Sequence, residues 1–415
     1  MPGPLASGVP VELWDEIFDH ILFYPFHSTV DIYSPFHVVY YLRRLNSHDL
    51  YEYRALKRHR RRLLLVCKSW YIHISQRSNL WIYRVTQRSD GVIIVPNALI
   101  TTLDCESCSF KAIKLFSRIH GAHIRSLHIH LMCYSYRTRK LVEVAAHHLP
   151  NLAVLSIHIS VEHKPVTLHD VSTRLTQLKA LSLARVGCDS NGNFFAGGNF
   201  HMPLLETLEL TSYSFGIWGD PSHLNLPALN HIYGQATGFV GSRSFFDCIG
   251  HQIQSIGLYG ELSVDQLTFD EFLQQLPNLK LLAADFRHLQ ITEDTPVVAG
   301  NLETLVHLGN TYIGFLTHPI VREFLGNVGR PGRKVRISDV WTPSGIVRYP
   351  DGGAKKHTLC YSQEQRDEMK SWAEEFKKAG VRLEDMKGLT YYEAERLSSS
   401  KQSNRQPSPL LNCPV

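Results

Sequence analysis

The chain of 415 residues is long enough for two or three domains or for one long repeat array. Its hydrophobic fraction of 44% and charged fraction of 20% are typical of a protein with a real core and argue against general disorder. The formal net charge of +5 is small for this length and does not indicate a nucleic-acid-binding protein.

The composition does not point to export or to a membrane. The first residues lack the basic and apolar regions of a signal peptide, and no stretch approaches the roughly 18 apolar residues that span a bilayer. The eight cysteines are dispersed, which favours reduced thiols and a cytoplasmic or nuclear location. Cys105 and Cys108 form a lone C-x-x-C without a second pair at zinc-binding spacing, so we predict no structural metal.

Two segments near the N-terminus have the apolar spacing of amphipathic helices. Residues 9–22 place their apolar side chains on one helical face, and residues 63–85 repeat this spacing. The end of the second segment, with Leu80, Trp81 and Val85, is predicted to form a short third helix. So small a bundle is marginal alone, and its tryptophans therefore indicate a docking interface.

Three motifs in these segments, VPVELWDEIF, LLLVCKSWYIHIS and NLW, follow one another in the order of an F-box. Over residues 9–22 and 63–83 the chain resembles the F-box-like proteins abundant in mushroom-forming fungi. The resemblance implies a three-helix module that docks on the Skp adaptor of an SCF-type cullin–RING ubiquitin ligase. It implies that the docking face is formed or supported by Val9, Pro10, Leu13, Ile17, Val66, Trp70, Leu80 and Trp81.

A long insertion, residues 23–62, separates the first two predicted helices. It begins with many aromatic residues, and we expect it to pack on the module or to extend its interface. Its end is the basic run Arg54 to Arg62, which we interpret as a solvated helix face. A nuclear-import signal and a phosphate-binding patch are the alternatives for this run.

From about residue 95 the motif L-x-x-L-x-L recurs in phase. Its nine copies begin at residues 100, 124, 152, 178, 205, 229, 253, 279 and 302. These intervals lie within the range of about 20–29 residues that leucine-rich repeats have. Several copies follow a proline-containing turn such as LPNL (149–152), and helical stretches such as 138–148 precede these turns. The recurring phrase favours an α/β repeat solenoid over an ordinary α/β fold with a parallel sheet.

In such a solenoid the leucines point inward and the intervening side chains line the concave face. We predict a target-binding surface on this face, because mixed polar and aromatic groups suit a protein partner. Its residues are expected to be His128, His130, His158, Glu209, Tyr233, Tyr259 and Asp285. The histidines are interpreted as solvated polar residues, because no Asp or Glu recurs at a position that would complete a metal shell.

The known catalytic and cofactor motifs are missing from the sequence. There is no G-x-S-x-G elbow, H-E-x-x-H helix, Walker loop or G-x-G-x-x-G fingerprint, so we expect neither an enzyme nor a cofactor. Residues 334–340 are predicted to form a strand. Residues 362–380 are predicted to form an amphipathic helix that ends at Gly380 and closes the C-terminal edge of the array. Its apolar stripe is expected to contain Met369, Trp372, Ala373 and Phe376.

We therefore predict an F-box-like helical module in residues 1–90, a leucine-rich-repeat-like array in 91–345, a capping helix region in 346–396 and a disordered tail in 397–415. The predicted function is that of a substrate-receptor adaptor, which holds a target protein of unknown identity for ubiquitin transfer by other subunits. The alternative is a repeat-type interaction scaffold that acts outside a ubiquitin ligase. Neither a membrane nor a nucleic acid is an expected partner.

Overall fold

The structure is a computed structural model that describes a subset of the chain. The described residues are 11–22, 62–76, 82–86, 102–106, 110–131, 138–159, 171–184, 200–211, 224–235, 243–259, 271–285, 301–307, 321, 324, 334–337, 340–342, 345–348, 357–360, 363–384, 390–393 and 396. Residues 23–61 of the predicted insertion and the predicted tail 397–415 lie outside them.

The chain forms two compact units, Met1–Gly260 and Glu261–Val415. The boundary between them falls inside the range 91–345, which the sequence predicts as one array. Each unit has α/β character, with an open parallel sheet and helices. Among the described residues, no helix has both the length and the apolar composition needed to cross a membrane.

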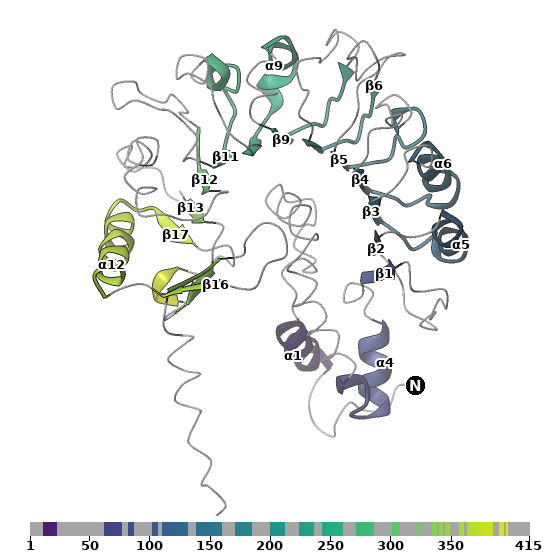
Figure 1. Ribbon diagram of the computed structural model, residues 1–415, viewed down its shortest axis with the longest axis horizontal. Helices are drawn as coiled ribbons and strands as arrows, with labels where there is room; N and C mark the ends of the chain where they lie inside the picture. The colour runs from purple at the N-terminus through teal and green to yellow at the C-terminus, as the bar shows by residue number, and fades with distance from the viewer. Residues whose placement is uncertain are drawn as a thin grey trace, which may run out of the picture. The chain divides into compact units, whose positions relative to one another are not determined.

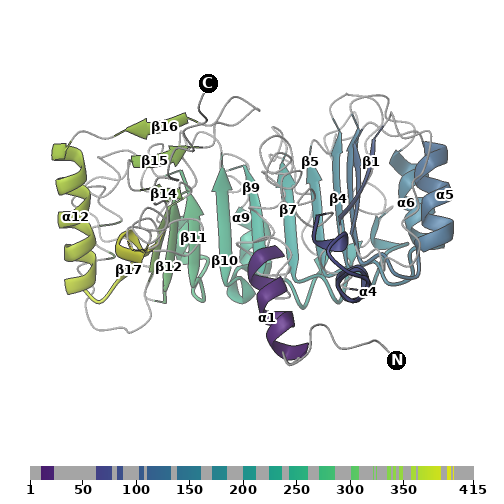
Figure 2. The same ribbon diagram turned by 90° about the horizontal axis from the view of Figure 1, so that it is seen from below.

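The first unit contains a parallel sheet whose strands follow the order β1-β2-β3-β4-β5-β7-β9-β10. The strands are β1 (Ile82–Thr86), β2 (Thr102–Glu106), β3 (Ser126–Leu131), β4 (Val154–Ile159), β5 (Ala180–Ala184), β7 (Thr207–Thr211), β9 (His231–Gln235) and β10 (Ser255–Tyr259). A second, short parallel pair consists of β6 (Phe200–His201) and β8 (Leu224–Asn225). Figure 2 shows the long strands side by side.

Three helices of the first unit lie on the same side of this sheet (Figure 1). They are α5 (Phe110–His120), α6 (Thr138–His148) and α9 (Arg243–Ile249), and a 3-10 turn, η5 (Gly250–Gln252), follows α9. The structure confirms a helix over 138–148 with the predicted bounds. Each helix buries apolar side chains, such as Phe116 in α5, Leu141 in α6 and Phe245 in α9.

The second unit contains a parallel sheet in the order β11-β12-β13-β17. Its strands are β11 (Leu281–Ala284), β12 (Thr304–His307), β13 (Lys334–Ile337) and β17 (Arg382–Glu384). An antiparallel sheet of β14 (Val340–Thr342), β15 (Gly345–Arg348) and β16 (His357–Cys360) accompanies it. Helix α12 (Gln363–Lys378) packs on β17, burying Ala373 and Phe376, and Gly380 follows it at φ 70°. The predicted strand near 334 and the predicted C-terminal helix are therefore confirmed.

A repeated turn precedes β3, β4, β5, β7, β9, β10 and β11. In each turn the fourth residue donates its N–H to the carbonyl of the first, as Leu152 does to Leu149 at 3.1 Å. The carbonyl just before a strand then accepts two N–H groups from the following repeat. Lys179, for example, accepts from Glu206 at 2.8 Å and from Thr207 at 3.0 Å. These bonds pair the backbone where each strand begins and hold the repeats in one register.

The register places the leucines of the repeated motif in a single row. Across β3 to β10 this row is Leu127, Leu155, Leu181, Leu208, Ile232 and Ile256, and all of them are buried. Each such side chain contributes about 1.5–3 kcal/mol when it is buried. All nine predicted copies of L-x-x-L-x-L coincide with strands, from β2 to β12.

The predicted third helix is wrong from residue 82 onward. Residues Ile82–Thr86 form β1, which pairs in parallel with β2 and places Val85 opposite Cys105. Ile82, Tyr83 and Val85 are of the β-branched and aromatic types that favour strands, and β2 supplies partners for their backbone. The sheet therefore begins within the range 1–90, ahead of the array's predicted start at residue 91.

The second N-terminal helix is also shorter than its apolar spacing predicts. It is α4 (Lys68–Gln76), and Leu65 and Val66 lie in a turn before it. The N–H of Trp70 donates to Sγ of Cys67 at 3.5 Å, and the N–H of Tyr71 to the Cys67 carbonyl at 3.0 Å. Cys67 therefore caps the start of α4, and the turn at residues 65–66 separates this helix from the helical residues 62–64.

Candidate functional site

Helix α1 (Val11–Leu22) and α4 pack through an aromatic cluster. The ring centroids of Trp14 and Phe18, one helical turn apart, are separated by 5.7 Å. Trp70 of α4 lies edge-on to both rings, with centroid separations of 5.1 Å to Trp14 and 5.0 Å to Phe18. Phe18 and Ile74 are fully buried, and Leu63 and Leu64 pack against them. The cluster is the only core that the described residues of this helical pair possess.

Several apolar side chains of the helical pair lie on its surface instead. The exposed fractions are 48% for Leu13, 39% for Ile17 and 59% for Val66. Leu13 and Ile17 are one turn apart on α1 and therefore share a face of the helix. Leu65 and Tyr71 are exposed as well. Exposed apolar side chains gathered on a small element are typical of a protein-binding surface.

The predicted docking residues thus divide into three groups. Leu13, Ile17 and Val66 are surface residues, whereas Trp70 belongs to the aromatic cluster and supports the surface from below. Val9, Pro10, Leu80 and Trp81 lie outside the described residues. Sequence reasoning overlooked Leu65 and Tyr71. The signal for Leu65 was the apolar run LLLV (63–66), because one helical face cannot bury four consecutive residues.

The second candidate surface is the polar face of the sheet, where the prediction of exposure is wrong. His128 and Glu209 are each 1% exposed, and Tyr233 is fully buried. The strands alternate as predicted, but both of their faces are covered, as is common for parallel sheets. Asp285, directly after β11, is half-buried. The backbones of His130, His158 and Tyr259 lie in β3, β4 and β10, and their side chains are outside the described set.

The buried polar residues form one row across the sheet. Along β3, β4, β5, β7 and β9 the register partners are His128, Ser156, Ser182, Glu209 and Tyr233. The Ser182 hydroxyl donates to Oε2 of Glu209 at 2.7 Å, and Nε2 of His128 lies 2.7 Å from Oγ of Ser126. These bonds replace part of the hydration that the polar groups lose on burial.

Tyr233 is the last residue of this row, and its ring lies beside a glycine on the next strand. Its register partner on β10 is Gly257, and a Cβ built there would lie 2.1 Å from Cδ1 of the tyrosine. The ring therefore occupies the space that a larger residue at 257 would need. The hydroxyl of Tyr233 is buried, and no hydrogen-bond partner for it occurs in the described part of the chain. Burial raises the pKa of Tyr233 well above its usual value, and the nearby Glu209 raises it further.

We expect Tyr233→Phe to increase the free energy of unfolding by about 1 kcal/mol, because it removes a buried hydroxyl without a partner. The difference should grow at alkaline pH. An unfolded tyrosine ionises near pH 10, whereas the buried one stays neutral, so the wild-type chain loses stability above about pH 10. Chemical denaturation followed by circular dichroism at pH 8 and pH 10.5 measures both effects.

Tyr71→Phe is the matched control for this prediction, since Tyr71 is 48% exposed. It should change stability by less than about 0.5 kcal/mol at either pH. A destabilising effect of Tyr233→Phe at pH 8 would contradict the expectation and show that the hydroxyl is hydrogen-bonded.

Amide side chains connect neighbouring turns of the repeats. Nδ2 of Asn151 donates to the carbonyl of Ala122 at 2.7 Å, and Nδ2 of Asn301 to that of Pro277 at 2.8 Å. Both asparagines directly precede the first leucine of a copy of the repeated motif, Asn151 before Leu152 and Asn301 before Leu302. For Asn151 the sequence signal was the N of the phrase LPNL, and the leucine pattern alone does not indicate this role.

The described residues contain no group of three or more His, Cys, Asp or Glu side chains that could hold a metal ion. No protein-family model matches the chain, and no curated protein is significantly similar to it.

Proposed function

We propose that the chain is a substrate-receptor adaptor of an SCF-type ubiquitin ligase. In this proposal α1 and α4 belong to an F-box-like module that docks on the Skp adaptor. The two sheet units are parts of a leucine-rich-repeat solenoid that holds a target protein. The observation that carries the proposal is the exposure of Leu13, Ile17 and Val66 on the helical pair.

The energetics of the pair favour a partner. Its aromatic cluster contains two fully buried side chains, so folding buries little apolar surface there. Roughly half of each of these side chains is already covered, so a partner that covers the rest would add about half of the 1.5–3 kcal/mol of full burial, roughly 1 kcal/mol each. Docking would thus stabilise the pair and remove its apolar surface from water. The rigid rings of Trp14, Phe18 and Trp70 support that surface without side-chain ordering on binding.

Calorimetric titration against the purified Skp adaptor tests the proposal. Ile17→Glu and Val66→Glu should each weaken binding by at least about 2 kcal/mol, because a carboxylate would have to be desolvated at the interface. Both positions are on the surface, so the variants should keep the far-ultraviolet circular dichroism and the melting temperature of the wild type.

Leu204→Glu provides the matched control. Leu204 is 49% exposed, similar to Leu13, but lies in the turn before β7. This variant should bind the adaptor as the wild type does. A wild-type chain that does not bind, or an equal loss in Leu204→Glu, would refute docking through the helical pair.

The second candidate function is a repeat-type interaction scaffold outside a ubiquitin ligase. The observation that favours it is β1, because residues 82–86 join the sheet where the F-box resemblance implies a third helix. Under this function α1 and α4 act as a helical element attached to a sheet-based interaction protein, and the titration gives no binding.

In this proposal the target protein contacts residues other than the buried ones that the sequence predicted as its binding surface. His128, Glu209 and Tyr233 are buried, so they support the sheet instead of touching a partner. Among the described side chains of the predicted target-binding set, Asp285 is the one that is partly exposed. We expect Asp285→Lys to alter target capture more than substitutions in the buried row that preserve folding.

A further inference from the structure

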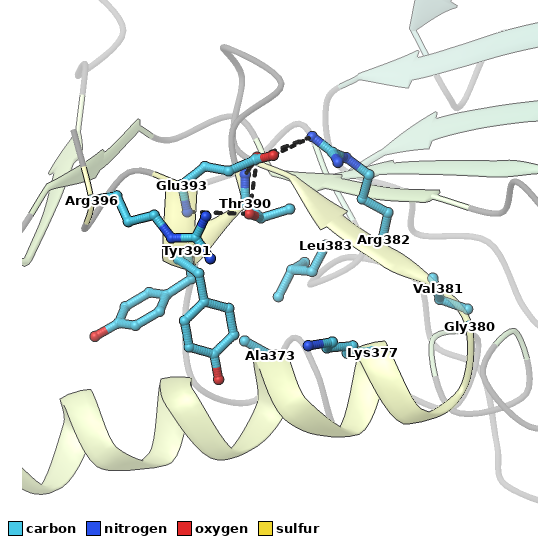
Figure 3. A pocket seen from close by; sticks show the side chains of 11 residues that line it. Ala373, Lys377, Gly380, Val381, Arg382, Leu383, Thr390, Tyr391, Glu393 and Arg396 are labelled. Atoms are coloured by element: carbon cyan, nitrogen blue, oxygen red, sulfur yellow. Dashed lines mark hydrogen bonds and ion pairs between the residues drawn. The ribbon is translucent and has the colours of Figure 1, made fainter.

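The second unit contains a pocket that neither proposed function uses. It lies between the C-terminal half of α12, strand β17, residues 390–393 and Arg396 (Figure 3). Its volume of about 510 Å³ is in the range of small-molecule sites. Ala373, Val381 and Leu383 are buried and give the pocket an apolar floor.

Part of the charge around this pocket is neutralised internally. Arg382 donates from Nε to Oε1 of Glu384 at 2.6 Å and from Nη2 to Oε2 of Glu393 at 3.0 Å. Glu393 also accepts from the N–H and the hydroxyl of Thr390, at 2.8 and 2.9 Å. The backbone N–H of Thr390 is the main cause of the lowered pKa of Glu393, so this carboxylate stays ionised and occupied.

Two further cations line the pocket and take no part in this network. Lys377 and Arg396 are exposed, and neither side chain has an ion pair or hydrogen bond within the described residues of the second unit. Figure 3 shows the side chain of Lys377 extending from α12 toward Ala373, and that of Arg396 close to Tyr391. The rings of Tyr391 and Tyr392 are 5.7 Å apart and nearly perpendicular, and the Tyr392 hydroxyl donates to Oε1 of Glu374 at 3.2 Å.

We propose that this pocket binds a phosphate monoester whose organic part is a flat ring. Lys377 and Arg396 hold the phosphate, and the ring packs against Tyr391 and the apolar floor. The unpaired cations favour an anion. The network of Arg382 with Glu384 and Glu393 carries one net negative charge and is closed by its own hydrogen bonds, whereas Lys377 and Arg396 both have donors left for a ligand. A phosphate monoester offers three acceptor oxygens to these two cations, whereas a carboxylate offers two.

The shape of the site agrees with this ligand class. A guanidinium and an ammonium offer several donors to the three phosphate oxygens, and Arg396 presents its donors in a planar fork. Tyr392 is held by Glu374, so its ring is fixed beside that of Tyr391 without a ligand. A ring that enters next to Tyr391 therefore meets a surface that is already ordered.

Titration calorimetry of the full chain with phenyl phosphate tests the proposal. Phenol has the same ring without the anion, and inorganic phosphate has the anion without the ring. Phenyl phosphate should bind at least about tenfold more tightly than either, because it alone uses both parts of the site. Its affinity should fall below pH 6, where the phosphate loses its second charge.

Variants separate the pocket from general attraction to a basic surface. Lys377→Gln and Arg396→Gln should each weaken phenyl phosphate about tenfold or more. Tyr391→Ala should weaken phenyl phosphate and leave inorganic phosphate unchanged. Lys378→Gln is the matched control, because Lys378 is the next residue of α12, is exposed and does not line the pocket.

The natural source of such a ligand can be distinguished with two further probes. Adenosine monophosphate represents a free nucleotide, and a peptide with phosphotyrosine represents a modified side chain; the tighter binder identifies the source. The proposal is overturned if phenyl phosphate shows no saturable binding, or if Lys378→Gln weakens it as much as Lys377→Gln does.

Discussion

Gly121→Ala is expected to lower the free energy of unfolding of the first unit by about 3 kcal/mol. A Cβ at this position would lie 1.8 Å from the backbone oxygen of His148 and 2.3 Å from that of Ser117. Both obstacles are backbone atoms, one at the end of α6 and one within α5, so no side-chain rotation can relieve the clash. Gly121 begins the turn before β3, at the place where the next repeat has Leu149. The glycine therefore allows the ends of the two helices to meet.

Urea denaturation monitored by circular dichroism measures this loss. Gly380→Ala is the control, because Gly380 has φ 70° and nothing lies within 4 Å of its virtual Cβ. There the cost is the left-handed backbone alone, about 1–2 kcal/mol. Equal costs for the two alanines would contradict the steric argument and show that the end of α6 yields to the methyl group.

Trp70→Ala is expected to unfold the helical pair, with a loss of about 3–5 kcal/mol. Its ring contacts both Trp14 and Phe18, at centroid separations of 5.1 and 5.0 Å. No other residue of α4 joins two aromatic rings of α1 among those described, and the cluster is too small to compensate for the cavity. Adaptor binding would be lost because the pair unfolds, whereas in Ile17→Glu it would be lost at the surface.

Hydrogen exchange with mass spectrometry distinguishes these two causes. In Trp70→Ala the amides of residues 11–22 and 68–76 should exchange rapidly, while those of β3 to β10 keep their protection. Leu65→Ala is the control, because Leu65 is 84% exposed and its truncation should cost less than about 0.5 kcal/mol. Retained protection in Trp70→Ala would show that the pair does not depend on this ring.

The strands could be predicted from the sequence because their signal is local and repeats. Each copy of L-x-x-L-x-L specifies which residues turn inward, and nine copies in phase leave one consistent register. The bounds of α6 and the end of α12 just before Gly380 follow in the same way from helical periodicity and from the demand for a positive φ. Such features depend on neighbours within one repeat, so the sequence alone determines them.

Which polar side chains are buried, and which segments pair as strands, depended on contacts between residues far apart in the sequence. Alternation correctly assigned His128, Glu209 and Tyr233 to the polar face, but whether that face meets water is decided by what covers it. Residues 82–86 became a strand because β2 offers a partner, which overrides a short-range helical pattern.

The same distinction between local signals and long-range contacts applies to the candidate sites. Helical spacing predicts that Leu13 and Ile17 share one face of α1. The partial burial of Trp70 and the exposure of Val66 do not follow from that spacing, since Val66 lies in a turn and Cys67 caps the helix that carries Trp70. The pocket of the second unit was beyond sequence reasoning as well. Its two unpaired cations, Lys377 and Arg396, come from separate elements, and only the network around Arg382 shows which charges remain for a ligand.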